Sequence, residues 1–306
     1  MQFQLKTPVA FIIFKRPETT KRVFEAIRQA KPPKLLVIAD GSRDDRQGEA
    51  EKCQATRAII KQVDWNCQVL THYSEINLGC AKRVSSGLNW VFEQVEEAII
   101  LEDDCLPEPT FFRFCEELLE RYRYDERIAS ISGQNVQFRR RRTEYDYYFS
   151  HYNHIWGWAT WRRAWQHYDF YMKHWPEIKK GNFLSNVLGD DKAVKIWTKV
   201  FQNMYDGNKY NTWDFQWQFA CWIHNSLGII SDINLISNIG FGEGSTHISS
   251  KKNKLANFPT ESLKFPLKHP PFMIRNTQAD KFTLQNLFSS LDPSIFQRLI
   301  WKIQTN

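Results

Sequence analysis

The chain of 306 residues lacks the features that define several other protein classes. It contains no run of 18 apolar residues, which excludes a predicted transmembrane helix. Its first eight residues have no apolar stretch of the signal-peptide type. The six cysteines form no Cys-x-x-Cys pair. We therefore expect reduced thiols, no zinc site and a cytoplasmic location.

Glycine motifs that bind phosphate are also missing. The sequence has no Gly-x-Gly-x-x-Gly after its first apolar segment and no Gly-x-x-x-x-Gly-Lys-Ser/Thr motif. These absences argue against a dinucleotide-dependent oxidoreductase and against a P-loop nucleoside triphosphatase.

Positive charge is concentrated near the end of the sequence. The formal net charge is +7, and residues 249–306 contain nine Lys or Arg against three Asp or Glu. A second basic run, Arg139–Arg142, looks like a solvated loop. Neither region has the interleaved aromatic residues of a nucleic-acid platform, so we expect no nucleic-acid partner. Aromatic residues are nevertheless abundant, at 15% with 12 Trp, as in proteins that stack sugars or have a large core.

Strand and helix patterns alternate through the first 135 residues. Amphipathic stretches that begin at Pro17, near Gly48, after Asn77 and at Pro109 predict helices. Apolar runs predict strands over residues 9–14, 35–39, 67–72, 98–101 and 128–132. Such alternation predicts an α/β fold with a mainly parallel central sheet and helices on both faces.

Three consecutive acids end one of these strand patterns. Glu102, Asp103 and Asp104 follow the apolar run Ala98–Leu101. In open α/β sheets, ligands bind beyond the carboxyl ends of the strands. Adjacent carboxylates repel one another, so we expect a cation among them, and hard oxygen ligands beside a phosphate suit Mg²⁺ or Mn²⁺. A strand that runs into an acidic surface turn is the simpler alternative.

Charged residues also follow two earlier predicted strands. Lys15 and Arg16 end the first, and Asp40 ends the second. In a parallel sheet these residues would share one edge with the three acids. An Asp there can accept a hydrogen bond from a nucleobase or a ribose, and an Arg can bind phosphate or base. Each could instead be an ordinary turn residue.

The order of these segments resembles that of the nucleotide-sugar-dependent glycosyltransferases of the GT-A fold. The chain is most similar to the Golgi N-acetylglucosaminyltransferases that act on mannose and to their bacterial relatives. The resemblance rests on Glu102–Phe112 (EDDCLPEPTFF), Trp213-Asp214 and Ile236–His247 (ISNIGFGEGSTH). It covers roughly residues 7–250, although residues 139–211, where acceptor contacts should lie, match poorly.

The resemblance implies a role for each matching residue in the first half. Asp104 would bind a Mn²⁺ or Mg²⁺ ion that bridges the donor diphosphate. Glu102 and Asp103 would reach the ribose or the donor sugar. Asp40 would contact the base, with Arg16 beside it.

The second half of the chain supplies the expected proton acceptor. Asp214 would be the general base of an inverting transfer, because an acceptor hydroxyl is a poor nucleophile at neutral pH. Without the resemblance, Asp214 is equally well explained as an acid at a helix N-terminus. His247 follows a glycine-rich stretch and could reach the metal or the diphosphate, although a histidine in such a place is more often at the surface.

A tryptophan-rich segment offers rings for sugar stacking. Tyr152–Trp165 (YNHIWGWATWRRAW) has four Trp in its last ten residues. Because Trp rings stack on the apolar faces of sugars, we expect Trp156 or Trp158, together with Trp213, at the acceptor or donor sugar. The other two Trp of the segment are expected in the core, and packing of the whole segment into the core is the alternative.

These observations predict a metal-dependent, inverting hexosyl- or N-acetylhexosaminyltransferase. Its partners would be a nucleotide-diphosphate sugar, with a UDP-sugar as the first guess, and a carbohydrate or lipid-linked acceptor. Two alternatives stay open. A nucleotidyltransferase that makes a nucleotide-sugar would need a glycine-rich loop after the first strand, and a carbohydrate-binding protein without activity would not need the acids.

We expect a catalytic domain over residues 1–250, with a nucleotide-binding half (1–135) and an acceptor-binding half (136–250). Residues 251–306 would form a basic extension that packs on this domain. Apolar residues recur on one face after Asp292-Pro293 and predict a helix near the end of the chain. That helix would pack on the enzyme or lie peripherally on an anionic membrane surface.

Overall fold

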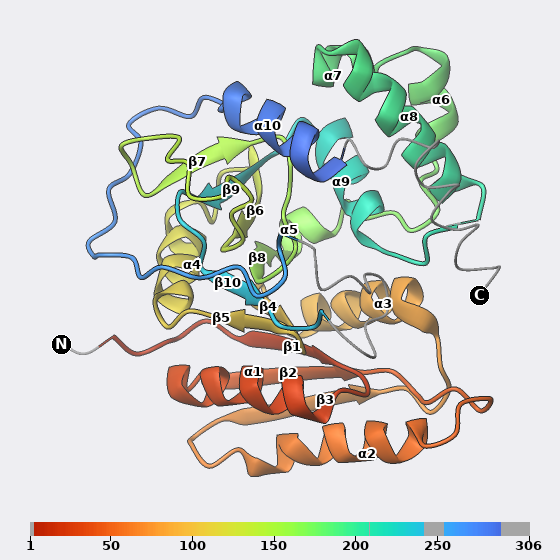
Figure 1. Ribbon diagram of the computed structural model, residues 1–306, viewed down its shortest axis with the longest axis vertical. Helices are drawn as coiled ribbons and strands as arrows, with labels where there is room; N and C mark the ends of the chain where they lie inside the picture. Colours follow the sequence, from red (N-terminus) through yellow and green to blue (C-terminus); the bar gives the residue numbers. More distant parts are fainter. Residues whose placement is uncertain (1–2, 208, 242–253, 289–306) are drawn as a thin grey trace.

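An eight-stranded sheet forms the centre of the computed structural model, which describes residues 3–207, 209–241 and 254–288 (Figure 1). The strand order is β3-β2-β1-β4-β8-β6-β9-β7. The strands are β1 (Val9–Ile13), β2 (Lys34–Ala39), β3 (Gln68–Tyr73), β4 (Glu97–Glu102), β6 (Ile128–Ser132), β7 (Tyr147–Ser150), β8 (Trp158–Trp161) and β9 (Leu227–Ser231). A separate antiparallel pair joins β5 (Cys105–Pro107) to β10 (Ile236–Asn238).

The sheet is mainly parallel. Strands β1 to β4, β6 and β9 run in one direction, and only β7 and β8 of the eight run the other way. Strands β1, β2 and β4 are buried along most of their length, as expected for parallel strands covered on both faces. The predicted α/β fold class is therefore confirmed.

Helices cover both faces of this sheet (Figure 1). Apolar residues of α1, α2 and α4 pack on one face, and those of α3, α5 and α9 pack on the other. The remaining helices α6, α7 and α8 lie together at one end of the molecule, where their apolar side chains pack with the outer side of α9. The helices are α1 (Pro17–Ala30), α2 (Glu49–Ile59), α3 (Gly79–Gln94), α4 (Thr110–Arg121), α5 (Arg162–Trp165), α6 (Trp175–Lys180), α7 (Leu184–Leu188), α8 (Asp191–Tyr205), α9 (Asp214–Ile223) and α10 (Thr277–Thr283), with a 3₁₀ turn at Ile60–Gln62 and a π turn at Leu284–Phe288.

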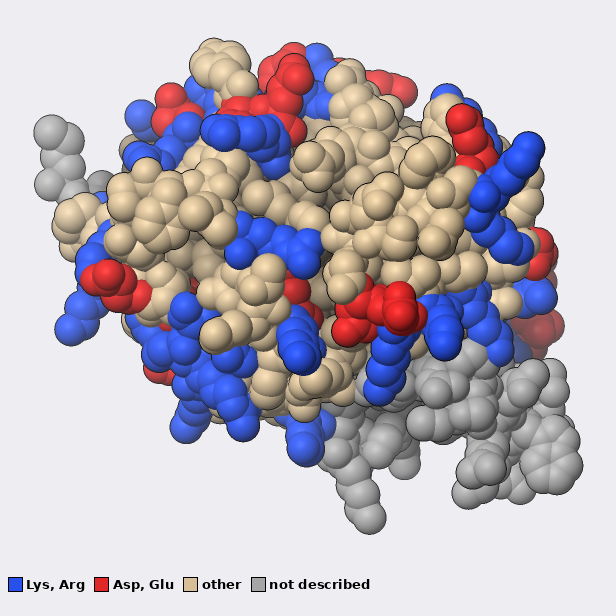
Figure 2. Space-filling view, turned by 90° about the horizontal axis from the view of Figure 1, so that it is seen from above, with Lys and Arg blue, Asp and Glu red and all other residues tan. Residues whose placement is uncertain are grey.

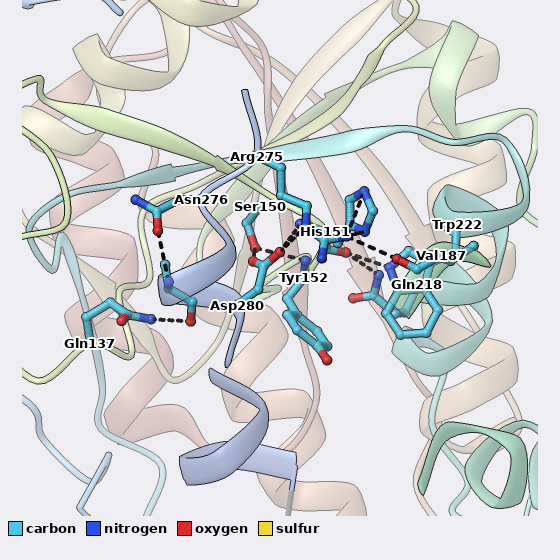
Figure 3. Close-up of polar contacts among 11 residues, drawn as sticks. Gln137, Ser150, His151, Tyr152, Val187, Gln218, Trp222, Arg275, Asn276 and Asp280 are labelled. Atoms are coloured by element: carbon cyan, nitrogen blue, oxygen red, sulfur yellow. Dashed lines mark hydrogen bonds and ion pairs between the residues drawn. The ribbon is translucent and has the colours of Figure 1, made fainter. Parts of the chain in front are cut away.

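Residues 254–288 run back along the sheet and end in α10 (Figure 1). Figure 3 shows the polar cluster that holds this segment beside the end of β7. The Asp280 carboxylate accepts a 2.5 Å hydrogen bond from Ser150 and forms a 3.2 Å ion pair with Arg275. Arg275 also contacts the His151 ring and donates to the Val187 carbonyl at 3.0 Å. This cluster links the late segment to β7 and α7 at once.

The division into domains stays a prediction, and the helix predicted after Asp292 lies outside the described residues. Among the described residues, no helix combines the length and the apolar composition needed to cross a membrane. Lys and Arg side chains are spread over the face seen in Figure 2, with Asp and Glu side chains between them.

Candidate functional site

The acid triplet lies where β1 and β4 end side by side. In the parallel register of these strands, Ile12 is the partner of Glu102. Glu102 is the last residue of β4, and Asp103 and Asp104 form the tight connection to β5. The chain of β1 continues only through a three-residue connection before α1 begins at Pro17. The acids and the start of α1 therefore share the carboxyl edge of the sheet, where ligands of open α/β folds bind.

Arg16 forms ion pairs with two of the three acids. Its guanidinium contacts Asp103 and lies 2.9 Å from the carboxylate of Asp104. The Phe14 amide donates a 3.2 Å hydrogen bond to Asp103. Asp103 is thus almost fully buried beneath the β1–α1 connection, and its two oxygens are used to hold that connection. Its expected contact with ribose or donor sugar stays a prediction.

The acids are close enough to perturb one another. Burial, together with the charges of Asp104 and Asp103, raises the pKa of Glu102 to about 8. Burial also raises the pKa of Asp103 to about 6, against the lowering effect of Arg16. A raised carboxyl pKa means that the folded site resists full ionisation, so an additional cation would be stabilised there.

Asp214 joins this cluster from the second half of the chain. Its charge contributes to the raised pKa of Glu102, from which it is separated by more than 100 residues of sequence. Asp214 is the first residue of α9, and its half-buried carboxylate accepts a hydrogen bond from the Thr212 hydroxyl. Burial raises the pKa of the half-buried Cys80 thiol, in α3, and the charges of Glu102 and Asp214 raise it as well. The four acids therefore lie close enough to interact electrostatically.

Asp40 stabilises the start of α3 through hydrogen bonds. Its carboxylate accepts hydrogen bonds from the amides of Leu78 at 2.9 Å, Gly79 at 3.0 Å and Gly41 at 3.0 Å. Burial raises the pKa of Asp40, and these hydrogen bonds oppose that shift. Asp40 thus lies at the same edge of the sheet, but contact with a nucleobase stays a prediction.

The tryptophan expectations need correction. Trp158 and Trp213 are each 1% exposed, and their rings stack at 5.6 Å between centroids. The reason is that β8 is inserted between β4 and β6, so α5 and α9 cover its side chains. Neither ring therefore offers a face to a sugar. Trp161 and Trp165 are buried, as expected.

Trp156 lies differently. It is half-buried, and its ring meets the edge of Phe241 with the centroids 5.8 Å apart. Phe241 belongs to the segment that follows β10, so Trp156 lies beside this segment. Its contact with a sugar stays a prediction.

The segment after β10 packs directly against the acids. The Ile239 amide donates a 2.8 Å hydrogen bond to the Asp104 carbonyl. A Cβ atom at Gly240 would lie 2.1 Å from the Asp104 carboxylate and 2.6 Å from the Arg16 guanidinium, so any larger residue there would displace these side chains. Sequence reasoning missed this requirement and the Thr212 contact. The Gly-Phe-Gly run was the available signal for Gly240, and no signal marked Thr212. His247 lies outside the described residues.

A divalent cation fits the donor set of this site. Within residues 3–207, 209–241 and 254–288, no group of three or more His, Cys, Asp or Glu side chains is arranged to hold a metal ion. Mg²⁺, however, is usually bound by one or two carboxylates together with substrate phosphates. The oxygen ligands at this edge, with Asp104 the more exposed of the two acids that pair with Arg16, match that mode.

Comparison with known proteins finds no matching family model and no match among curated proteins. Solved structures give matches of low similarity. The mannosyltransferase PcManGT from Pyrobaculum calidifontis, in complex with GDP-Man and Mn²⁺, is 14% identical with a TM-score of 0.37, over 52% of this chain and only 45% of its own. An apo UDP-glucose pyrophosphorylase is 8% identical with a TM-score of 0.37, over 75% of this chain and 93% of its own. Mouse xyloside xylosyltransferase 1 is 10% identical with a TM-score of 0.32, over 70% of this chain and 81% of its own. At such TM-scores these likenesses establish neither activity nor ligand.

Proposed function

We propose that this protein is a glycosyltransferase that moves a sugar from a nucleotide-diphosphate sugar to a hydroxyl of a carbohydrate or lipid-linked acceptor. The observation that carries the proposal is the convergence of Asp214 with the acid triplet at the carboxyl ends of β1 and β4. A proton acceptor beside a charged diphosphate site is the pair of functions that such a transfer requires. A UDP-sugar is the first donor to test.

In the proposed reaction, Asp214 accepts the proton of the acceptor hydroxyl as its oxygen bonds to the anomeric carbon of the donor sugar. The bond from that carbon to the diphosphate oxygen breaks, and the nucleoside diphosphate leaves from the opposite side. The configuration at the anomeric carbon is therefore inverted. Arg16, which pairs with Asp103 and Asp104, exchanges one carboxylate for a diphosphate oxygen and so stabilises the leaving group.

Asp104 is the residue proposed to hold Mn²⁺ or Mg²⁺ jointly with the diphosphate. When bound, such an ion supplies positive charge to the leaving group. The raised pKa values of Glu102 and Asp103 support a cation at this position, because the site carries more acid than Arg16 alone neutralises.

Two features favour transfer of a sugar over the alternatives. The connection between β1 and α1 has three residues, too few for the glycine-rich loop with which a nucleotidyltransferase would hold a triphosphate. A binding protein without activity would gain nothing from clustered acids, because their mutual repulsion and burial are costly.

The test is the Asp214→Asn variant, which keeps the size of the side chain and loses the proton acceptor. Turnover of the donor and acceptor pair is expected to fall by roughly 10²–10⁴-fold, with binding of the donor little changed. The matched control is Asp191→Asn, because Asp191 is likewise the first residue of a helix but lies in α8 and is exposed. Near-normal turnover of Asp214→Asn, or a product with retained configuration by NMR, contradicts the role.

A further inference from the structure

A concave region lies between the start of α3 and the end of α8. Its volume is about 240 Å³. This is below the range of roughly 300–1,000 Å³ of pockets for drug-sized ligands and is suited to a single small ring. Six of the residues that line it come from three separate segments, namely Leu78 and Ala81, Phe170 and Tyr171, and Tyr205 and Asn211.

Two segments that line this pocket are linked to the candidate site residues Asp40 and Asp214. The Ala81 amide donates a 3.4 Å hydrogen bond to the Asn211 side chain, which also packs against Gly79. Asn211 precedes Asp214 by three residues, in the turn that leads into α9. In the same segment as Ala81, the Leu78 amide donates a 2.9 Å hydrogen bond to the Asp40 carboxylate. A ligand in the pocket would therefore contact the turn that is hydrogen-bonded to Asp40 and the turn that leads to Asp214.

Two exposed aromatic rings line this one pocket. Tyr171 is 79% exposed and Tyr205 is 44% exposed, although large rings are usually buried. The Phe170 ring lies 5.3 Å from the Tyr171 ring and meets it edge-on. Lys82 and Asn211 add hydrogen-bonding groups at the same pocket. Ring faces combined with hydrogen-bond donors match a sugar, which has apolar C–H faces and a rim of hydroxyls, better than a purely apolar ligand.

We infer that this pocket is the acceptor subsite and that it binds a terminal sugar ring of a carbohydrate acceptor. The ring stacks on Tyr171 or Tyr205, and a hydroxyl of that sugar is directed toward Asp214. This inference rests on the proposed glycosyl transfer and specifies its acceptor. It also assigns acceptor binding to the stretch between residues 170 and 211, which carries none of the segments of the glycosyltransferase resemblance.

Saturation-transfer difference NMR on the full-length protein tests this subsite, with the methyl glycosides of glucose, galactose, mannose and N-acetylglucosamine as probes. At least one glycoside is expected to bind the wild type. The Tyr171→Ala/Tyr205→Ala variant should bind it about two- to tenfold more weakly for each lost ring. The Tyr171→Phe/Tyr205→Phe variant keeps both rings and should retain binding. The control Tyr124→Ala removes a ring that is 89% exposed elsewhere and should change nothing.

Unchanged glycoside binding by the double alanine variant overturns the subsite, as does the absence of binding by the wild type. Mn²⁺-dependent binding of UDP-glucose, measured on the same samples, separates this failure from that of the proposed function. The double alanine variant should keep nucleotide binding. If the wild type binds a glycoside but none of UDP-, GDP- and dTDP-glucose, the pocket is not an acceptor subsite, and the proposed function fails with it.

Discussion

At the scale of single residues, Arg16 lies between two carboxylates whose side chains are 4% and 14% exposed. Removal of one partner from such a cluster leaves the other charges uncompensated. The free energy of unfolding of Arg16→Met is therefore expected to fall by about 3 kcal/mol at neutral pH, measured by urea denaturation. Because Arg16 lowers the pKa of Asp103, which is about 6 in the wild type, Asp103 takes up its proton at a higher pH in the variant, so the loss should shrink as the pH falls toward about 6.

The matched control for Arg16→Met is Arg22→Met, because Arg22 is exposed on the same helix, α1. Its stability should stay within about 0.5 kcal/mol of the wild type. Equal free energies of unfolding for the two variants would mean that Arg16 is not needed to compensate the charges of Asp103 and Asp104.

The roles of single residues were only partly predictable from the sequence. The acid triplet stood out because a strand pattern ended in three charges. In contrast, Trp158 and Trp213 looked available for sugars because a sequence does not reveal how many neighbours cover a ring. The separation between Asp214 and Glu102 also hides their proximity, which arises only when α9 packs on the sheet.

At the scale of secondary structure, the connection that follows β10 holds the acids in place. Gly240→Ala would press a methyl group between Asp104 and Arg16, so these side chains must separate. Displacements of about 1 Å near reacting groups can cost 10²-fold in rate. We expect kcat/KM to fall by up to about 10²-fold while circular dichroism still reports a native fold. Full activity in this variant would show that the ion pair can rearrange freely.

In the polar cluster beside the end of β7, His151 and Asp280 are expected to change the stability of the fold with pH in opposite directions. Burial, with the charge of Arg275, lowers the pKa of His151 to about 4, so the unfolded chain takes up this proton first. Stability from His151 is therefore lost as the pH falls from about 6.5 to 4. Burial raises the pKa of Asp280 to about 6, so its contribution has the opposite sign and grows as the pH falls through 6.

Urea denaturation at several pH values separates the two contributions. Between pH 6.5 and 4, the stability of His151→Gln should decrease less steeply than that of the wild type. Asp280→Asn should decrease more steeply, because it loses the compensating group. If stability changes with pH in the same way in the wild type and in both variants, His151 and Asp280 are excluded as the titrating groups.

The strands and helices of the first half were predictable because the apolar residues of each followed one periodicity and the segment had a clear end in the sequence. The helix predicted to begin at Pro17 is α1, and the strand predicted at 128–132 is β6. Strand β8 was missed, since its residues are buried on both faces and show no alternation. An antiparallel strand inserted between β4 and β6 is decided by tertiary packing, which no local pattern encodes.

At the scale of the whole molecule, the candidate site draws residues from both halves of the chain. Asp40, the acid triplet and Asp214 lie near the carboxyl edge of the same sheet, so a ligand bound there would contact both halves of the chain. A ligand that binds only the folded protein stabilises it by about 2.7 kcal/mol when present at 100 times its dissociation constant. UDP-glucose with Mn²⁺ should accordingly raise the midpoint of thermal unfolding by several degrees, measured by differential scanning fluorimetry.

The Asp104→Ala variant tests whether this stabilisation depends on the proposed metal ligand. Its unfolding midpoint without ligand should stay near that of the wild type, because the Asp104 side chain is partly exposed and Arg16 keeps its pair with Asp103. Its response to UDP-glucose with Mn²⁺ should vanish, and EDTA should abolish the response of the wild type in the same way. Asp45→Ala removes an acid that is 76% exposed and should respond like the wild type. A shift that persists in Asp104→Ala, or that survives EDTA, would separate nucleotide binding from the acid triplet and leave Arg16 as the residue that binds the diphosphate.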